Sequence, residues 1–194
     1  MRHIGLARGK VRVVPYSPVW PQLFADEKRR LSKALAPYVT EIQHVGSTSI
    51  PGLAAKPLID ILGAVESLDD YKKLITPLQS LGYEFMPERV FTDRIFFPKG
   101  PRSHRTHHLS LVLRDSRQWQ DTTLFRDYLA RHKDARNAYG RLKLDLAKKF
   151  PDDRTRYTEA KSKFIEGVLS TAKAVTVLDP GASVSPLGKD VARL

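Results

Sequence analysis

Two short apolar segments, joined by a turn of small residues, form the most distinctive pattern in the chain. Apolar and polar residues mix over 39–45, and a largely apolar run follows at 58–65. Short apolar runs bounded by glycine and proline are typical of buried strands. The second run contains one carboxylate, Asp60, and a buried charge is costly unless a metal ion or a basic group accompanies it. We therefore predict two strands and a functional role for Asp60, with a structural ion pair as the alternative.

Two amphipathic helices are predicted beside these strands. Apolar residues recur at mostly helical spacing over 18–36, and Ser17 followed by proline is a good N-terminus for that helix. A second apolar stripe covers 68–81, with Ser67 as its candidate cap and Gly82 as its stop signal. A strand followed by a helix and then by further strands indicates an α/β unit with a mixed sheet.

Further strands are predicted from alternation and from turn residues. Residues 10–15 are a candidate edge strand, and 83–86 and 94–97 are expected to pair with each other across a polar connection. Residues 106–113 alternate clearly, so that three leucines share one face and His108 lies on the other.

The last third of the chain is predicted to be helical. Three amphipathic segments lie between 116 and 172, and Pro151 separates the second from the third. Asp152 or Asp153 can cap the third segment. Residues 175–194 are rich in proline, glycine and serine and show no period, which predicts a flexible tail.

Together these elements predict one domain of the α/β (α+β) class. A chain of 194 residues is typical of a single domain. We place that domain at 1–174, with an irregular polar start at 1–10, a sheet-containing part at about 11–113 and a helical part at about 116–172. The expected architecture is a mixed β-sheet flanked by helices, followed by a helical C-terminal portion.

The chain is strongly basic, with 33 Lys and Arg against 21 Asp and Glu and a formal net charge of +12. Such a balance favours anionic partners such as nucleotides, and a generally basic, solvated surface is an equal alternative. The basic residues are scattered among acidic ones and form no compact block with interleaved aromatics, so nucleic-acid binding is not favoured.

The composition also excludes several kinds of protein. The absence of cysteine excludes disulfides, cysteine nucleophiles and cysteine-rich zinc sites. No apolar run approaches the length of about 20 residues that a membrane-spanning helix needs, and the N-terminus lacks the apolar core of a signal peptide. We therefore expect no membrane partner and a cytoplasmic location.

The turn between the first two strands is a candidate phosphate site. Gly46 lacks a Cβ and so lets the backbone approach a phosphate, and Ser47 adds a hydroxyl donor. Thr48 belongs to the same turn, and Lys56 stands at the entry to the second strand, where it could meet a phosphate. Lys161 is a weaker candidate of the same kind, and for both lysines a solvated surface position is the alternative.

One histidine is a candidate partner for the buried carboxylate. Neighbouring side chains on a strand point to opposite faces, so only one of His107 and His108 can join Asp60. His108 lies on the more polar face and is our candidate ligand or base, with a hydrogen-bonded core histidine as the alternative.

Residues 44–62 resemble the signature of the GrpB family, a branch of the nucleotidyltransferase superfamily; they read HVGSTSIPGLAAKPLIDIL. Motifs on both sides, from about residue 11 to about residue 169, resemble the family in the same order: Val13-Val14-Pro15-Tyr16-Ser17-Pro18-Val19-Trp20, Arg105-Thr106-His107-His108-Leu109, Phe125-Arg126-Asp127-Tyr128-Leu129, Phe150-Pro151-Asp152-Asp153 and Tyr157-Thr158-Glu159-Ala160-Lys161.

The resemblance implies a nucleotidyltransferase-like fold and a particular chemistry. In that superfamily a Gly-Ser pair precedes a strand with two acidic residues, which hold divalent ions, Mg²⁺ or Mn²⁺. These bridge a triphosphate such as ATP or another NTP while a nucleotidyl group moves to an acceptor hydroxyl. By this resemblance Asp60 and His108 are the catalytic and metal-binding candidates, and the phosphate-binding candidates are Gly46, Ser47, Thr48, Lys56 and Lys161.

The match departs from the pattern at two positions. Leu62 stands where the superfamily has its second acid, and Ser110 stands where the GrpB family usually has a histidine. Neither residue completes a two-metal site, and the set Asp60, His108 and Ser110 suits one transition metal, or a bound phosphate without metal.

Two functions therefore remain open. The first is binding of a nucleoside triphosphate with metal-dependent transfer of a nucleotidyl group to an unidentified small-molecule acceptor. The alternative is a non-catalytic nucleotide- or anion-binding module that keeps the fold without the metal chemistry, which the missing second acid favours. A nucleic-acid accessory role rests on charge alone and would show as steep weakening by salt without nucleotide preference.

Overall fold

The computed structural model describes residues 4–178 of the chain. Within them the elements follow in the order α1 (Trp20–Leu35), β1 (Val39–Val45), the short 3-10 helix η1 (Ser47–Ser49), β2 (Ile59–Val65), α2 (Tyr71–Ser80), the 3-10 helix η2 (Pro87–Arg89), β3 (Ile95–Lys99), β4 (His107–Leu113), α3 (Arg117–Arg131), α4 (Lys133–Lys149), α5 (Arg154–Glu159) and α6 (Ser162–Leu178).

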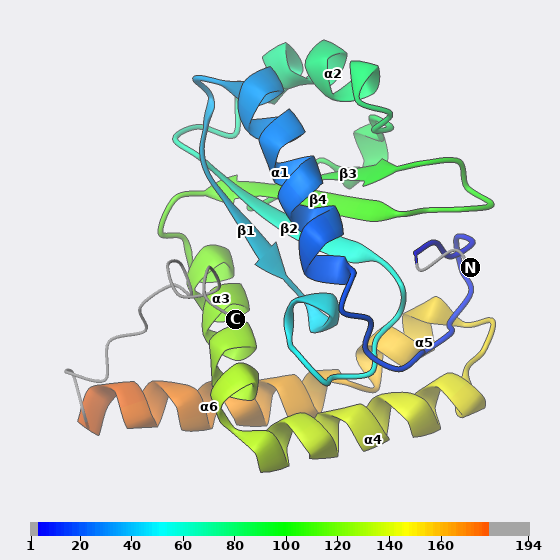
Figure 1. The fold of residues 1–194 in the computed structure, drawn as a ribbon. Helices are drawn as coiled ribbons and strands as arrows, with labels where there is room; N and C mark the ends of the chain where they lie inside the picture. The colour runs from blue at the N-terminus through cyan, green and yellow to red at the C-terminus, as the bar shows by residue number, and fades with distance from the viewer. Residues whose placement is uncertain (1–3, 179–194) are drawn as a thin grey trace.

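The four strands form one mixed sheet in the order β1-β2-β4-β3. β1 is antiparallel to β2, β2 is parallel to β4, and β4 is antiparallel to β3. The parallel pair is possible because the connection from β2 to β4 is long and includes α2, as parallel neighbours require. The predicted class is therefore confirmed: a mixed sheet flanked by helices, with a helical C-terminal portion (Figure 1).

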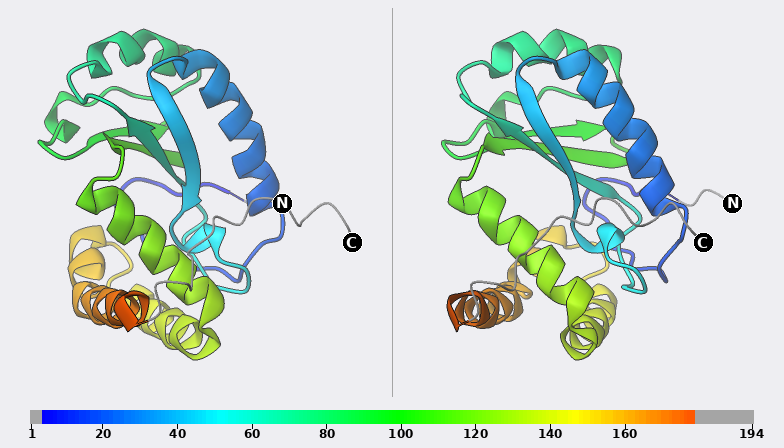
Figure 2. Two further views of the ribbon diagram at one scale, coloured as in Figure 1. Left: turned by 90° about the vertical axis from the view of Figure 1, so that its left-hand side faces the viewer. Right: turned by 60° about the vertical axis from the view of Figure 1, so that its left-hand side comes forward.

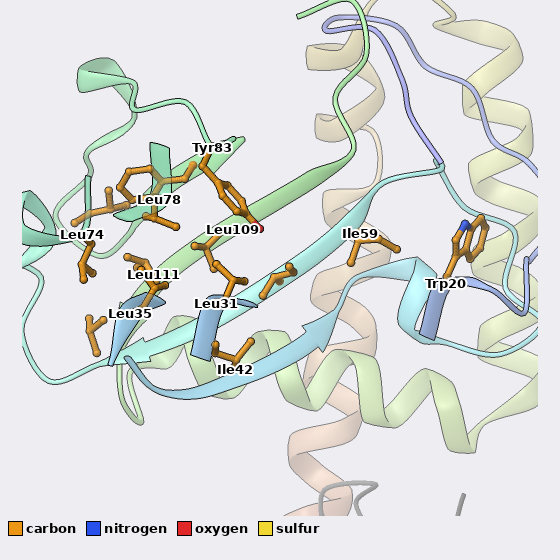
Figure 3. Close-up of a cluster of buried hydrophobic side chains, with 14 of the residues drawn as sticks. Trp20, Leu31, Leu35, Ile42, Ile59, Leu74, Leu78, Tyr83, Leu109 and Leu111 are labelled. Carbon is orange, nitrogen blue, oxygen red and sulfur yellow. The ribbon is translucent and has the colours of Figure 1, made fainter. Parts of the chain in front are cut away.

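The main core lies between α1 and one face of the sheet. α1 crosses this face, and α2, at the top of the view in Figure 1, packs into the same core. Side chains of α1 interlock with those of the central strands and of α2, as Figure 3 shows for Trp20, Leu31, Leu35, Ile42, Ile59, Leu74, Leu78, Tyr83, Leu109 and Leu111. Burying one such side chain stabilises the fold by about 1.5–3 kcal/mol, so this face holds the sheet firmly in place.

The opposite face of the sheet is covered only in part. A smaller apolar cluster joins the sheet to α3 and consists of Val45, Leu62, Ala64, Val112 and Trp119. Leu62 is thus a core residue here, which accounts for an apolar side chain at the position where an acid would stand. Asp60 and His108 lie on the same face, two residues before Leu62 and Ser110 and so nearer the start of β2 and β4.

The C-terminal helices pack beneath the turn that precedes β2. α4 and α6 lie side by side below α3 (Figure 2). Ile50 and Leu53 of the turn share one apolar cluster with Leu129, Tyr139 and Val168 from α3, α4 and α6. The helical part therefore supports the small-residue turn from below and fixes its position relative to the sheet.

The first helix begins later than its sequence pattern predicts. Its first residue is Trp20, Val19 holds the cap position, and no side chain caps the helix. Pro21 explains the difference, because a helix capped by Ser17 would place Pro21 where a backbone N–H must bond to the Ser17 carbonyl. Ser17 instead accepts a bond from the Trp20 amide at 3.2 Å.

The second helix also begins later, at Tyr71, although its end is as predicted. The Ser67 hydroxyl accepts a bond from the Asp69 amide and so stabilises a turn before the helix. Gly82, with φ of +85°, follows the last turn, and its amide bonds to the Gln79 carbonyl. The apolar stripe predicts this helix correctly, but Ser67 stabilises a turn before the helix and does not cap its first turn. Serine side chains favour both kinds of position.

Two of the predicted strands are wrong. Residues 10–15 contribute one isolated bridge, between Val14 and Ala55, and the pairing of 83–86 with 94–97 is replaced by a bridge from Tyr83 to Lys99. β3 pairs with β4 instead. The predicted irregular start is ordered from residue 4 onward, because Leu6 pairs with Arg105 and is buried.

The third C-terminal segment is two helices rather than one. Asp153 caps α5 through the Arg156 amide, as predicted, and the chain then bends at 160–161 before α6. α6 continues to Leu178, past the predicted start of a tail at 175, while the remaining predicted tail, 179–194, lies outside the described residues. No helix among residues 4–178 is long and apolar enough to cross a bilayer.

Candidate functional site

Asp60 and His108 form a pair on the face of the sheet that α3 covers only in part. They face each other in register on the parallel strands β2 and β4, and His108 Nδ1 lies 3.1 Å from Asp60 Oδ1. The Asp60 side chain is 43% exposed and that of His108 is 7% exposed. Burial opposes ionisation of Asp60, but the hydrogen bond and charge of His108, together with Lys56 and Arg154, hold the pKa of this carboxyl below its usual value.

The turn after β1 runs directly against this carboxylate. Gly46 has φ of +70° and ψ of −174°, and a Cβ on it would lie 2.5 Å from Asp60 Oδ2. Only glycine adopts this backbone region readily. Glycine is therefore required at this position because any Cβ would collide with Asp60. The turn also brings the partly exposed Ser47 to the same edge.

Thr48 is placed differently from its neighbours in the turn. Its side chain is buried, and its hydroxyl lies 3.1 Å from both the Leu58 carbonyl, to which it donates, and His44 Nε2. His44 in turn stacks on Phe24 with ring centres 4.6 Å apart. Thr48 thus links the turn to the start of β2, so its role is structural.

Arg126, which the sequence patterns did not single out, anchors the same turn from α3. Its guanidinium donates to Gln43 Oε1 and to the His44 carbonyl, each at 2.9 Å. It also forms two bonds to the buried carboxylate of Asp127, at 2.6 and 3.1 Å. Because His44 is two residues before Gly46, Arg126 positions the strand end from which the turn begins.

Three lysines gather beside the site, between the signature turn and the C-terminal helices. Lys56 Nζ and Lys161 Nζ lie 5.4 and 4.4 Å from the ring centre of Tyr157. Lys143, which is only 2% exposed, donates to the Ala54 carbonyl. The structure therefore brings both predicted lysines together and adds a third, Lys143, that resembles an ordinary helix-surface lysine in sequence.

Burial, and after it repulsion by neighbouring cations, lowers the pKa of all three amines. Burial and then the charges of Arg154 and Lys161 lower the pKa of Lys56 to about 8. Burial lowers the pKa of Lys161 to about 8, against the attraction of Asp60. Burial and the charges of the other two lysines lower the pKa of Lys143 to about 7. At neutral pH the cluster is therefore crowded with positive charge that a bound anion would relieve.

These pKa values predict that the protein becomes more stable as pH rises from 7 to 9.5. An amine with a folded-state pKa below its unfolded value of about 10.4 binds fewer protons when folded, so the free energy of unfolding increases with pH between the two values. Urea denaturation across this range should show a smaller increase for Lys143→Met than for the wild type. Lys148→Met, which removes an exposed lysine from the same helix, should keep the wild-type slope; equal slopes in all three proteins would contradict the assignment.

An arginine-lined cavity of about 590 Å³ opens next to the pair. Its lining includes Arg8, Arg89, Arg94, Arg154 and the ring of Phe96. Two much smaller hollows, of about 10 and 20 Å³, are lined by His108 together with Arg8 and Arg154. His108 thus lines both small hollows, which share Arg8 and Arg154 with the larger cavity.

The residues at Asp60 do not fit a two-metal centre. Such a centre needs several carboxylate oxygens, whereas this site offers one carboxylate and one imidazole, with Lys56, Lys161 and Arg154 close enough to influence the Asp60 charge. Within the part of the chain that the structure describes, no group of three or more His, Asp or Glu side chains could hold a metal ion. The donor set favours an anion at this place.

Known proteins resemble this chain over most of its length. The family model described as "GrpB protein" matches residues 10–171. A UPF0157 protein of Pseudomonas aeruginosa is 42% identical over 170 residues, which cover 86% of this chain and 69% of that protein. The glutamate-rich protein GrpB of Alkalihalophilus pseudofirmus is 35% identical over 171 residues, covering 86% of this chain and 98% of that protein.

A solved structure and an enzyme sequence extend the comparison. The crystal structure of the conserved protein GrpB from Enterococcus faecalis superposes with a TM-score of 0.78 at 34% identity and covers 86% of this chain and 99% of that chain. A dephospho-CoA kinase of Mycobacterium bovis is 28% identical over 183 residues, covering 80% of this chain but 44% of the kinase. The family model spans most of the sequence, with the signature turn, Asp60 and His108 inside it, and on these grounds the chain belongs to the GrpB family.

Proposed function

We propose that this protein binds a phosphate-bearing ligand, a nucleoside triphosphate above all, at the signature turn. One observation carries the proposal: Lys56, Lys161 and Arg154 all lie near enough to act electrostatically on a single carboxylate, Asp60, at an edge where the Gly46 turn brings backbone close to it. The positive charge exceeds the negative charge in this cluster, and a polyphosphate would balance it.

The turn suits the geometry of an anion as well as its charge. Gly46 and Ser47 lie at the end of β1 beside Asp60, and Ser47 is partly exposed. Lysine binds phosphate as a point charge, and arginine binds it through a planar pair of N–H donors. Thr48 is engaged within the protein, so we assign ligand contact to Gly46, Ser47, Lys56 and Lys161 and leave Thr48 as a support.

Nucleotidyl transfer, as in the nucleotidyltransferase superfamily, is a second candidate because Asp60 and His108 are hydrogen-bonded in register. In that reaction the acceptor oxygen forms a bond to the α-phosphorus, the bond from this phosphorus to the bridging oxygen breaks, and pyrophosphate leaves. His108 would take the acceptor's proton, with Asp60 orienting the imidazole and stabilising its charged form. A single Mg²⁺ or Mn²⁺ would be held by Asp60 in this candidate, and His108 would act either as the base or as a second metal ligand, since its one remaining ring nitrogen cannot do both.

The two candidates predict opposite effects of Asp60→Asn on ATP binding. Without a metal, Asp60 repels the phosphates, so its neutralisation should tighten binding about five- to tenfold, as the removal of one like charge at short range predicts. If Asp60 holds a divalent ion, the same substitution should abolish metal-dependent binding. Calorimetric titration of ATP, GTP, CTP and UTP, with and without Mg²⁺ or Mn²⁺, measures both effects.

The matched control is Asp145→Asn, which removes an exposed carboxylate from α4. It changes the net charge equally and should leave the affinity unchanged. Tighter metal-free binding in Asp60→Asn alone supports the anion-binding module, and loss of metal-dependent binding supports transfer. Failure of all four nucleotides to bind under any condition would rule out both candidates.

A further inference from the structure

The arginine cavity collects side chains from parts of the chain that are far apart in sequence. Arg8 comes from the N-terminal segment, Arg89 from η2, Arg94 from just before β3 and Arg154 from the first turn of α5. The N-terminal segment and α5 lie close together on the same side of the molecule (Figure 1). A volume of about 590 Å³ lies within the range of small-molecule sites, so the space suits a metabolite-sized ligand.

No salt bridge among the described residues neutralises these arginines. Ion pairs elsewhere use Arg105 with Glu84 and Arg126 with Asp127. None of the salt bridges within residues 4–178 involves Arg8, Arg89, Arg94 or Arg154, and Glu159 is the one acidic side chain in the cavity lining. Apart from the attraction between Asp60 and Arg154, their charges are therefore not paired within the described residues, and an anion in the cavity would pair them.

Aromatic rings hold two of the arginines in place. The Arg89 guanidinium lies 6.0 Å from the ring centre of Phe96, and that of Arg94 lies 5.2 Å from the ring centre of Phe91. Arg94 Nε is buried and has no hydrogen-bond partner among the described residues. Stacked guanidinium groups are pre-oriented, which lowers the entropic cost of forming bidentate bonds to an oxyanion.

The cavity adjoins the signature site but is separate from it. Phe96 lines the cavity and also lies 5.1 Å, ring centre to ring centre, from His108. His108 in turn bonds to Asp60. The rings of His108 and Phe96 therefore lie between Asp60 and the cavity, and Arg154 lines the cavity while its charge also acts on Asp60.

We propose that the cavity formed by Arg8, Arg89 and Arg94 is a second anion subsite that takes a phosphate ester, so that the protein holds two phosphate groups on either side of His108. The proposal rests on the proposed function for the first phosphate group, at the signature turn. It also narrows the unknown acceptor or second ligand to a phosphorylated small molecule. An uncharged ligand would leave the arginines unbalanced, and an extended nucleic acid would not enter a cavity of this size.

Calorimetric titration of inorganic pyrophosphate without metal tests the proposal on the full chain. We expect two equivalents per chain for the wild type. The double variant Arg89→Gln/Arg94→Gln should lose one of them, by a weakening of at least about tenfold, as expected for the loss of charge-assisted hydrogen bonds. Lys161→Met should lose the other. Arg117→Gln/Arg131→Gln, which removes two exposed charges from α3, is the charge-matched control and should keep both.

Each remaining result has a definite meaning. One equivalent, lost in Lys161→Met and unchanged in the arginine double variant, would overturn the second subsite and leave the proposed function standing. One equivalent, lost only in the arginine double variant, would support the arginine subsite and count against the signature site. One equivalent lost in both variants would mean one continuous site and would overturn the second subsite, as would equal weakening in the charge-matched control or no binding at all.

Discussion

Replacement of Arg126 with methionine is expected to lower the free energy of unfolding by about 3–5 kcal/mol, the range measured when one partner of a buried ion pair is removed. The Arg126 and Asp127 side chains are only 12% and 10% exposed. Loss of the guanidinium leaves the Asp127 carboxylate without its bidentate partner and frees the Gln43 and His44 acceptors at the end of β1. Urea denaturation followed by circular dichroism measures the change.

A second variant separates lost packing from an unpaired charge. Arg126→Met/Asp127→Leu removes both charges and should recover much of the stability, because the cost of the single variant is chiefly that of the stranded carboxylate. Both variants should bind pyrophosphate more weakly than the wild type at the signature turn, since neither retains the bonds that hold the strand end before Gly46. A double variant as unstable as the single one would show that Asp127 is not the source of the loss.

The sheet was largely readable from sequence because its strands carry strong local signals. β1 and β4 are short and bounded by turn residues, β4 alternates with a period of two, and both strands are found within a residue of the predicted limits. Helix starts were less secure, since Ser17 and Ser67 stabilise turns as readily as helices. For the helix near Ser17, the sequence also contains the residue that indicates the later start, because Pro21 can occupy only the first turn of a helix.

The candidate site was readable only where its residues belong to one motif. Asp60 stands out as a carboxylate in an apolar run, and Gly46 as a turn residue, and the two meet in the structure. Lys143 and Arg154 could not be found in this way, because each is an ordinary helix residue in sequence. What distinguishes them is burial or convergence on Asp60, which depends on how the C-terminal helices pack against the turn.

The same limit applies to the arginine cavity. Arg8 lies in a segment that looked irregular, and its place follows from the pairing of Leu6 with Arg105, a contact between residues far apart in sequence. Phe96 lies on β3, which is an edge strand of the sheet. Only the tertiary arrangement shows that these side chains share one space with Arg89 and Arg94.

Gly46→Ala is expected to cost about 1–3 kcal/mol of stability from backbone strain alone, because φ of +70° with ψ of −174° is a region that side chains oppose. The added methyl group would also meet Asp60 Oδ2 at 2.5 Å, so Asp60 must move away from His108. Gly52→Ala is the matched control: Gly52 has φ of +78°, but a Cβ there meets nothing within 4 Å. Thermal denaturation and pyrophosphate titration should show lower stability in both variants and weaker binding in Gly46→Ala alone. Equal loss of binding in the two would mean that the shape of the turn, and not its contact with Asp60, controls the phosphate site.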